Sequence, residues 1–284
     1  MSFLVDDKNL IDSAMSTELV SESHNFDKIV DAMRYSALGG KRLRGILTLE
    51  FAKMFGCCTE EAMPYAVAVE CIQAYSLIHD DLPCMDDDDI RRGKPSCHIA
   101  FGEANALLAG DALLTHAFSA ISESFSANNH PERAIKAVKI LSELAGFRGM
   151  VGGQVLDLEA AEKEVSAETL GTIHKLKTGA LIKSAVLMGC YAAGAKDSDC
   201  FLCEKYAEEF GLSFQIIDDI LDFDGNYNTC ELNSYVKVHG LEKAKEDARF
   251  HIEKAKAVLK KLSELGYKTE NFTELLDFLI RRMK

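Results

Sequence analysis

Apolar residues recur at helical spacing along most of the chain. Residues 104–121, 135–144 and 241–259 each carry a stripe in which every third or fourth position is mostly Ala, Leu, Ile, Val or Phe. This spacing is typical of amphipathic helices with one face against a core. No segment shows the alternation of β-branched residues that strands favour, and only four prolines interrupt the pattern. The chain is therefore predicted to be all-α, with about ten or more helices.

Composition adds an expectation of one large core. No linker rich in Ser, Gly or Pro divides the sequence, and 48% of its residues are hydrophobic. We therefore expect a single domain over residues 1–284, with no apolar run long enough to span a bilayer. The acidic N-terminal segment does not resemble a signal peptide, and nine cysteines, an odd number, are typical of reduced thiols. We expect a cytoplasmic protein.

Two aspartate clusters follow apolar helical runs. One is Asp80-Asp81-Leu82-Pro83-Cys84-Met85-Asp86, and the other is Asp218-Asp219-Ile220-Leu221-Asp222. Carboxylates concentrated in this way repel one another unless a multivalent cation lies among them. Oxygen ligands without His or Cys favour Mg²⁺, which binds protein carboxylates together with substrate phosphates. The two clusters therefore predict Mg²⁺ held against a diphosphate.

The local sequence suggests how each cluster is presented. Pro83 disfavours helical geometry just before it, so the first helix is expected to end near the aspartates. Asp218 and Asp222 are four residues apart and share a helix face, with Asp219 about 100° away. We expect Gly211 and Gly225 to bracket this second helix. The run 87–89 is expected to support the site without binding the ion directly.

Charge patterning restricts the class of ligand. The net charge of −13 argues against nucleic-acid binding, which needs a basic face. Basic residues are instead local: Gly39-Gly40-Lys41-Arg42-Leu43-Arg44, Arg91-Arg92 and Lys177-Thr178-Gly179. Lysine and arginine next to a glycine turn suit a diphosphate. A basic surface turn, or a helix kink with an exposed lysine, would look the same in sequence.

In this order, the motifs resemble those of the trans-polyprenyl diphosphate synthases, most closely the bacterial farnesyl type. The matching segments are 39–44, 70–97, 101–106, 152–158, 174–182, 214–222 and 278–284. The resemblance implies an isoprenoid synthase-type bundle of mostly antiparallel helices around a deep central cavity, assembled as a homodimer. It also implies Mg²⁺-dependent, head-to-tail condensation of isopentenyl diphosphate with dimethylallyl or geranyl diphosphate.

Site roles follow from the same resemblance. Three Mg²⁺ ions per site would be held by Asp80, Asp86 and Asp218, with Asp81 and Asp222 acting through water or outside the direct coordination. The remaining roles cover both substrates. The allylic diphosphate would contact Arg91, Lys177, Thr178 and Gln215, and the carbonyl or hydroxyl dipoles at Lys177 and Thr178 and the amide of Gln215 would stabilise the allylic cation. Isopentenyl diphosphate would contact Lys41, Arg44, Gln73 and Arg92. The released diphosphate would take the proton, so no protein base is required.

Product length is predicted from the helix before the first cluster. Tyr75 lies five positions before Asp80, and Ser76 lies one turn before it. A bulky residue there would form the floor of the pocket for the growing chain, and in the family an aromatic residue goes with the fifteen-carbon product. The alternative is that Tyr75 is an ordinary core residue.

One segment departs from the family pattern. After Asp222 the family has a flexible loop with two lysines, whereas residues 223–235 are about ten residues shorter and contain neither lysine. Either the loop is truly shortened, or residues are missing from the sequence as given, and the abrupt joint near Asn233-Ser234 favours the second. The alternatives to a farnesyl diphosphate synthase are a geranylgeranyl or geranyl diphosphate synthase and a catalytically weak regulatory subunit of the same fold.

Overall fold

The helices predicted from the apolar spacing are present in the structure, a computed structural model described for residues 1–21, 23–124, 128–161 and 163–283. More than ten helices account for most of the chain, so the all-α prediction is confirmed. Their bounds are α1 Ser2–Glu18, η1 His24–Phe26, α2 Asp27–Ala37, α3 Leu43–Met54, α4 Thr59–Asp80, α5 Cys97–Phe101, α6 Glu103–Ser122, α8 Pro131–Ala145, α9 Met150–Ala160, α10 Ala167–His174, η2 Lys175–Gly179, α11 Ala180–Ala193, α12 Asp197–Asp222, α13 Tyr235–His239, α14 Leu241–Glu264 and α15 Glu270–Arg282.

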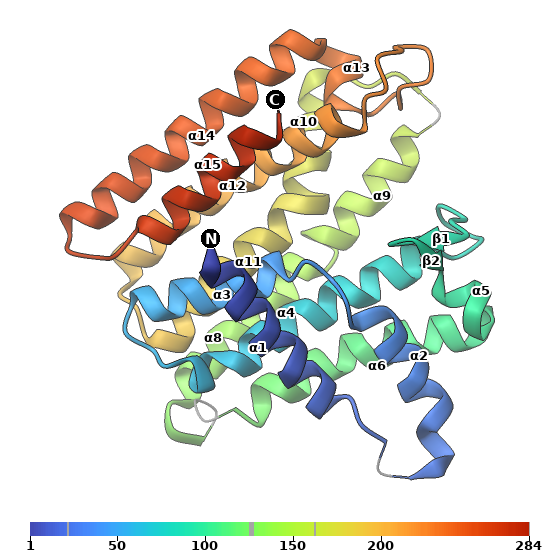
Figure 1. Ribbon diagram of the computed structural model, residues 1–284, viewed down its shortest axis with the longest axis vertical. Coiled ribbons are helices and arrows are strands. Elements are labelled where there is room, and N and C mark those ends of the chain that lie inside the picture. The colour runs from blue at the N-terminus through green and yellow to red at the C-terminus, as the bar shows by residue number, and fades with distance from the viewer. Residues whose placement is uncertain (22, 125–127, 162, 284) are drawn as a thin grey trace.

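Helix α11 lies at the centre of the bundle. It packs against α3, α4, α8 and α12, and its sequence is apolar on nearly every side, as expected of a helix without a solvent face. Around it, α12, α14 and α15 lie together at the upper left of Figure 1, while α4 and α6 run across the lower half. One continuous core extends from Ile11 to Leu279. The single domain over 1–284 remains a prediction, and this core supports it.

A short hairpin follows the first aspartate cluster and was not predicted. Strands β1 Ile90–Arg91 and β2 Lys94–Pro95 pair in antiparallel fashion. Arg92 and Gly93 between them have φ values of 55° and 75°. Two successive residues with positive φ make the tight turn that suits the twist of a hairpin. A pair of two-residue strands is too short to leave an alternating pattern in the sequence.

Two glycines bring helices together beneath the site. A Cβ on Gly153 of α9 would lie 2.2 Å from the backbone nitrogen of Lys177, and one on Gly211 would lie 3.2 Å from the Cα of Gly179. The prediction that Gly211 begins a helix is therefore wrong, because α12 starts at Asp197 and Gly211 lies inside it. Its role is close packing against η2. This segment is a π-helical turn, a distortion that occurs frequently at functional sites.

Across the described ranges, none of the helices combines the length and the hydropathy needed to cross a membrane.

Candidate active site

Both aspartate clusters lie at the C-terminal ends of long helices. Helix α4 ends at Asp80, as Pro83 led us to expect, and the backbone turns back so that the amide of Asp86 donates to the carbonyl of Asp80 at 2.9 Å. Helix α12 ends at Asp222, which places Asp218 one turn before its end.

Burial disfavours the charged form of the carboxylates predicted as metal ligands, and nearby cations compensate it only in part. Burial raises the pKa of Asp80 to about 6; Lys177 opposes the rise and Asp86 adds to it. Burial also raises the pKa of Asp86 and of Asp218. Oxygen donors whose charged form is disfavoured in this way fit a site completed by a hard cation.

The middle aspartate of each cluster is used by the protein itself. Asp81 is buried and accepts from Arg91, whose Nε lies 2.8 Å from its carboxylate. Asp219 accepts from the Gln215 amide at 2.8 Å and from the backbone N–H of Tyr235 at 2.6 Å. Both residues therefore anchor neighbouring segments.

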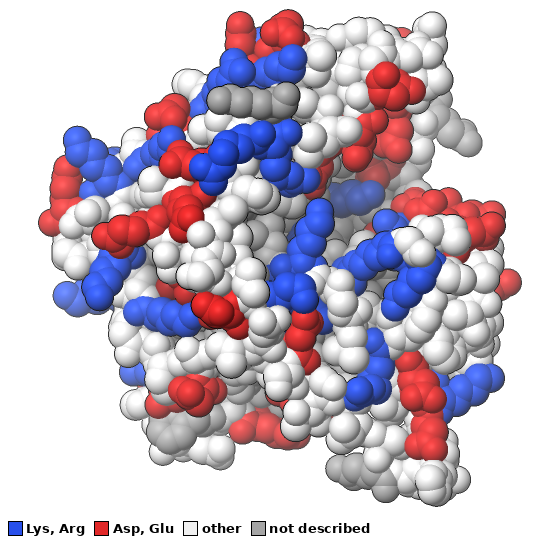
Figure 2. Space-filling model, viewed as in Figure 1, with Lys and Arg blue, Asp and Glu red and all other residues white. Residues whose placement is uncertain are grey.

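A cavity of about 770 Å³ gathers the basic residues identified in the sequence. Figure 2 shows a hollow near the centre of the face drawn, with Lys and Arg side chains around it. The cavity is lined by Arg91 and by the four residues predicted to bind isopentenyl diphosphate, which are Lys41, Arg44, Gln73 and Arg92. Phe278 and Leu279 of α15 form an apolar side. Gly40 allows Arg92 to approach, since a Cβ there would lie 3.2 Å from the guanidinium.

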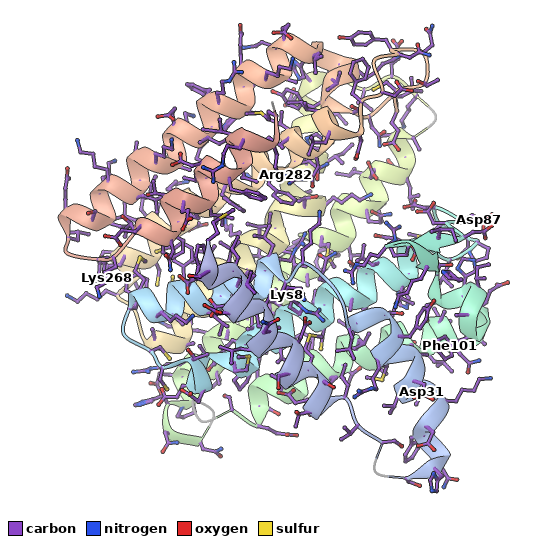
Figure 3. All side chains as sticks on the ribbon, in the orientation of Figure 1. Lys8, Asp31, Asp87, Phe101, Lys268 and Arg282 are labelled. Atoms are coloured by element: carbon purple, nitrogen blue, oxygen red, sulfur yellow. The ribbon has the colours of Figure 1, made fainter. Side chains whose placement is uncertain are left out.

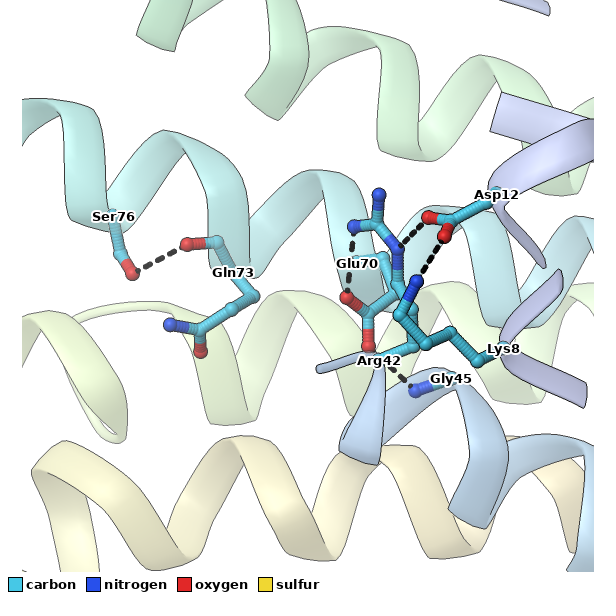
Figure 4. Close-up of polar contacts among 7 residues, drawn as sticks. All are labelled: Lys8, Asp12, Arg42, Gly45, Glu70, Gln73 and Ser76. Carbon is cyan, nitrogen blue, oxygen red and sulfur yellow. Dashed lines mark hydrogen bonds and ion pairs between the residues drawn. The ribbon is translucent and has the colours of Figure 1, made fainter. Parts of the chain in front are cut away.

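Arg42 and Arg44 point to different environments. Arg42 has a φ of 59° at the start of α3 and is only 2% exposed. It pairs with Asp12 at 2.7 Å and with Glu70 at 3.3 Å, so it secures the turn (Figure 4). Burial lowers the pKa of Arg44, and its Nε has no hydrogen-bond partner in the described part of the chain. Because a buried donor without a partner is costly, Arg44 fits a site for an anionic ligand.

A second cavity of about 500 Å³ extends from Asp80 along α4 and α9. Tyr75 and Ser76 line it, together with apolar side chains of α6 and α9, and it shares Arg44, Gln73 and Leu77 with the basic cavity. Tyr75 is 7% exposed and packs against His79 with ring centroids 5.7 Å apart. Burial raises the pKa of Tyr75 to about 12, so its hydroxyl stays neutral. The two cavities are therefore adjacent, one basic and one apolar.

The π-helical turn presents a polar network between the two clusters. Lys177 Nζ donates to Asp157 at 2.5 Å, and the Thr178 hydroxyl donates to the Gln215 side-chain oxygen at 2.6 Å. Burial acts to lower the pKa of Lys177, but Asp157, Asp80 and other nearby carboxylates outweigh it and the pKa is raised. Lys177 therefore remains charged beside the first cluster.

Two site residues were not predicted individually. Arg282 lies 3.2 Å from Asp218 and lines the basic cavity; Figure 3 labels it on α15. Asn233 donates to Asp157 at 2.6 Å. The segment 278–284 was part of the resemblance, but nothing in the sequence indicated which arginine turns inward. Asn233 carried no signal, because its partner lies 76 positions away.

Comparison with known proteins shows to which family the chain belongs. The model for polyprenyl synthetases matches residues 27–236. The chain belongs to the polyprenyl synthetase family. It is 46% identical to the farnesyl diphosphate synthase of Escherichia coli (strain K12), over 90% of each chain. It is also 37% identical to the geranylgeranyl diphosphate synthase of Cyanophora paradoxa, over 99% of this chain and 96% of that one.

A solved structure supports the fold of this family member. The FPP/GFPP synthase from Zymomonas mobilis superposes with a TM-score of 0.85 at 34% identity, over 98% of this chain and 95% of that one. The predicted isoprenoid synthase-type bundle is confirmed.

The comparisons also bear on the short loop. The farnesyl diphosphate synthase of Bacillus subtilis (strain 168) is 40% identical over 294 aligned positions, covering 99% of this chain and 97% of the relative. Since this chain has 284 residues, that relative has residues with no counterpart here. Residues 223–235 contact both α9 and α12. The additional residues of that relative agree with either interpretation, a true shortening of the loop or residues missing from the sequence as given, and an intact mass decides between the two.

Proposed function

We propose that this protein is a Mg²⁺-dependent prenyltransferase that condenses isopentenyl diphosphate with dimethylallyl and geranyl diphosphate to give farnesyl diphosphate. The observation that carries the proposal is the adjacency of the basic cavity and the apolar pocket, which share Arg44, Gln73 and Leu77 beside Asp80. One cavity suits a diphosphate and the other suits a prenyl chain. The family membership and the farnesyl diphosphate synthases among the relatives support the same activity.

The carboxylates proposed to hold Mg²⁺ are Asp80, Asp86 and Asp218, with three ions per site. Bound Mg²⁺ would neutralise the charge that develops on the leaving diphosphate. Asp81 acts outside the direct coordination by fixing Arg91, and Asp222 acts through water. The raised pKa of Asp80 and the all-oxygen donor set support this assignment.

Lys177 and Arg91 would bind the allylic diphosphate from the protein side. Each is a fixed cation: Lys177 is held by Asp157 and Arg91 by Asp81. Donors that are positioned before the reaction stabilise charge without reorganising. As the allylic C–O bond breaks, the dipoles of the Thr178 hydroxyl and the Gln215 amide, which are hydrogen-bonded to each other, would stabilise the allylic cation.

Isopentenyl diphosphate would bind in the basic cavity through Lys41, Arg44, Gln73 and Arg92. Its double bond attacks the allylic cation and forms the new C–C bond. The released diphosphate then removes a proton to give the new double bond. Arg282, which lines this cavity beside Asp218, joins the predicted residues as a further contact for the diphosphate.

Product length would be set by Tyr75 at the wall of the apolar pocket. Tyr75→Ala should lengthen the main product from fifteen carbons toward twenty, because the side chain no longer blocks the pocket. Tyr191→Ala is the matched control, since Tyr191 belongs to α11 and lines neither cavity. Unchanged farnesyl output from Tyr75→Ala would remove Tyr75 from this role. A twenty-carbon product from the parent protein would favour the geranylgeranyl alternative.

We further propose a homodimer located in the cytoplasm. Large apolar side chains that line neither cavity are exposed, among them Leu108 at 54%, Ile135 at 67% and Phe147 at 77%. Apolar side chains of this kind suit burial against a second subunit. All nine cysteines are free thiols, which supports a reducing compartment.

The decisive experiment is incubation with isopentenyl and dimethylallyl diphosphates and Mg²⁺, followed by sizing of the dephosphorylated alcohols. A fifteen-carbon alcohol is expected. No condensation would reject the proposal and favour the catalytically weak subunit.

A further inference from the structure

The loop between α12 and α13 brings no cation of its own to the site. Residues 223–234 contain neither Lys nor Arg. The next lysine, Lys237, donates to the backbone oxygen of Tyr227 at 2.7 Å and so stabilises the loop itself. The charge of a bound diphosphate must therefore be balanced by Mg²⁺ and by cations from outside this loop.

This loop is nevertheless tied to the site at its end. Asn233 Nδ2 lies 2.6 Å from Asp157 Oδ1, and the Tyr235 N–H lies 2.6 Å from Asp219 Oδ2. Asp224 closes the other end by accepting from the backbone N–H of Asn226 at 2.8 Å. We call residues 223–235 the strap, since they connect α12 to α9 through hydrogen bonds.

Asp157 connects the strap to Lys177 in the π-helical turn η2. Its Oδ1 accepts from Asn233, and its Oδ2 accepts from Lys177 at 2.5 Å. An ammonium group has three donors, so Lys177 keeps two for a diphosphate while one is bound to Asp157. The position of Lys177 therefore depends on the orientation of Asp157, which depends in turn on Asn233.

We propose that Asn233 is a positioning residue for the allylic diphosphate: it orients Asp157, and through Asp157 it directs Lys177 to the diphosphate. The proposal rests on the proposed function and adds to it a residue of this loop. A neutral amide suits this position because it donates a hydrogen bond without competing with Lys177 as a second cation. A carboxylate there would repel Asp157.

The first test compares Asn233→Ala with Asn228→Ala, an exposed asparagine of the same loop. A hydrogen bond to a charged group is among the stronger ones, so Asn233→Ala should lower kcat/KM for the allylic diphosphate about tenfold. The loss should appear mainly as a higher KM for the allylic substrate, with the KM for isopentenyl diphosphate unchanged. Asn228→Ala should match the parent.

The second test uses pH to restore the donor. The carboxyl introduced by Asn233→Asp cannot donate to Asp157 when ionised, but it can when protonated. The titratable groups around it are Asp157, His174, Lys177, Asp219 and Glu231. The activity of Asn233→Asp, divided by that of the parent at the same pH, should therefore rise as the pH falls from about 8 to about 6. The same ratio for Asn228→Asp should not change with pH, and a flat ratio for both variants would overturn the positioning role.

A third measurement does not depend on activity. Amide hydrogen exchange over residues 223–238 should be faster in Asn233→Ala than in the parent or Asn228→Ala, because one anchor of the strap is lost. An intact mass of 31.3 kDa first establishes that the loop has the printed length. An active parent whose Asn233→Ala variant matches it in kinetics and exchange overturns the proposal alone. An inactive parent rejects the proposed function, and the exchange comparison then decides whether Asn233 holds the strap.

Discussion

Both aspartate clusters begin with two adjacent aspartates, but they are stabilised by different chemistry. In the first, the middle residue, Asp81, is neutralised by the Arg91 guanidinium from the neighbouring hairpin. In the second, the donors to Asp219 among the described residues are neutral, the Gln215 amide and the Tyr235 N–H, with His174 Nε2 3.6 Å away. Burial lowers the pKa of His174 to about 4, so that imidazole is neutral.

These different partners affect the pKa values and the ion pairs of the two clusters. Burial raises the pKa of Asp219 to about 6, and the hydrogen bonds from Tyr235 and Gln215 oppose it. Asp218 in the same cluster has Arg282 at 3.2 Å, whereas the side chain of Asp80 makes no hydrogen bond or ion pair within the described ranges. In the first cluster the middle residue, Asp81, forms the ion pair with an arginine. In the second cluster the first residue, Asp218, does so. Two clusters that begin with the same pair of aspartates therefore differ in their electrostatics.

The largest effect should come from removing the charge of Asp80, a proposed Mg²⁺ ligand without an ion pair in the described ranges. Asp80→Asn should lower kcat/KM about a thousandfold, because the loss of charge stabilisation is worth several kcal/mol. Steady-state kinetics with saturating Mg²⁺ measures it. Asp87→Asn is the control: Asp87 is exposed in the loop labelled in Figure 3, and asparagine tolerates its φ of 52°. Comparable losses in both variants would contradict the assignment.

The two middle aspartates provide the next test. Asp81→Asn removes the buried partner of Arg91, so we expect a loss of about 2 kcal/mol in the free energy of unfolding and at least tenfold in kcat/KM. Asp219→Asn keeps an oxygen for the Tyr235 N–H and should cost about 1 kcal/mol. Denaturant unfolding and steady-state kinetics measure both. If Asp219→Asn is the more damaging change, the contrast between the clusters is wrong.

The pH dependence of thermal stability should differ between the metal-free and the metal-bound protein. Because the pKa of Asp80 in the folded state is about 6, above its ordinary value, this group stabilises the metal-free fold most at low pH, and that contribution is lost as the pH rises through 6. Mg²⁺ with inorganic diphosphate binds the ionised form, so the rise in Tm that they cause should be larger at pH 7.5 than at pH 5. Thermal unfolding with and without these ligands measures it. An increase that is the same at both pH values, or that persists in Asp80→Asn, would count against the site.

The smallest effect concerns the arginine of the second cluster. Arg282→Gln removes a cation from the basic cavity and from Asp218, and we expect KM for isopentenyl diphosphate to rise about threefold to tenfold. Arg281→Gln, at the exposed neighbouring position, should leave KM unchanged. Equal KM values in the two variants would remove Arg282 from the diphosphate site.

Much of this site was predictable because its signals are local. A helix ends before Pro83 because proline restricts the preceding residue, and Asp218 and Asp222 share a face because they are four residues apart. The bounds of α12 were harder to predict from sequence. Gly211 was expected near a helix terminus, yet it lies inside α12, where its missing side chain allows contact with Gly179. Whether a glycine ends a helix or packs against a neighbour depends on a segment far away in the sequence.

The helical fold, the two carboxylate clusters and the basic segments around them could be predicted from sequence, since periodicity and residue type act over a few positions. How these groups are used depends on the folded structure. It paired Arg42 with Glu70 and left the Nε of Arg44 without a partner among the described residues, and it paired Asn233 with Asp157 across the site. Such pairings require segments distant in sequence to meet, and only packing of the whole bundle brings them within hydrogen-bonding distance.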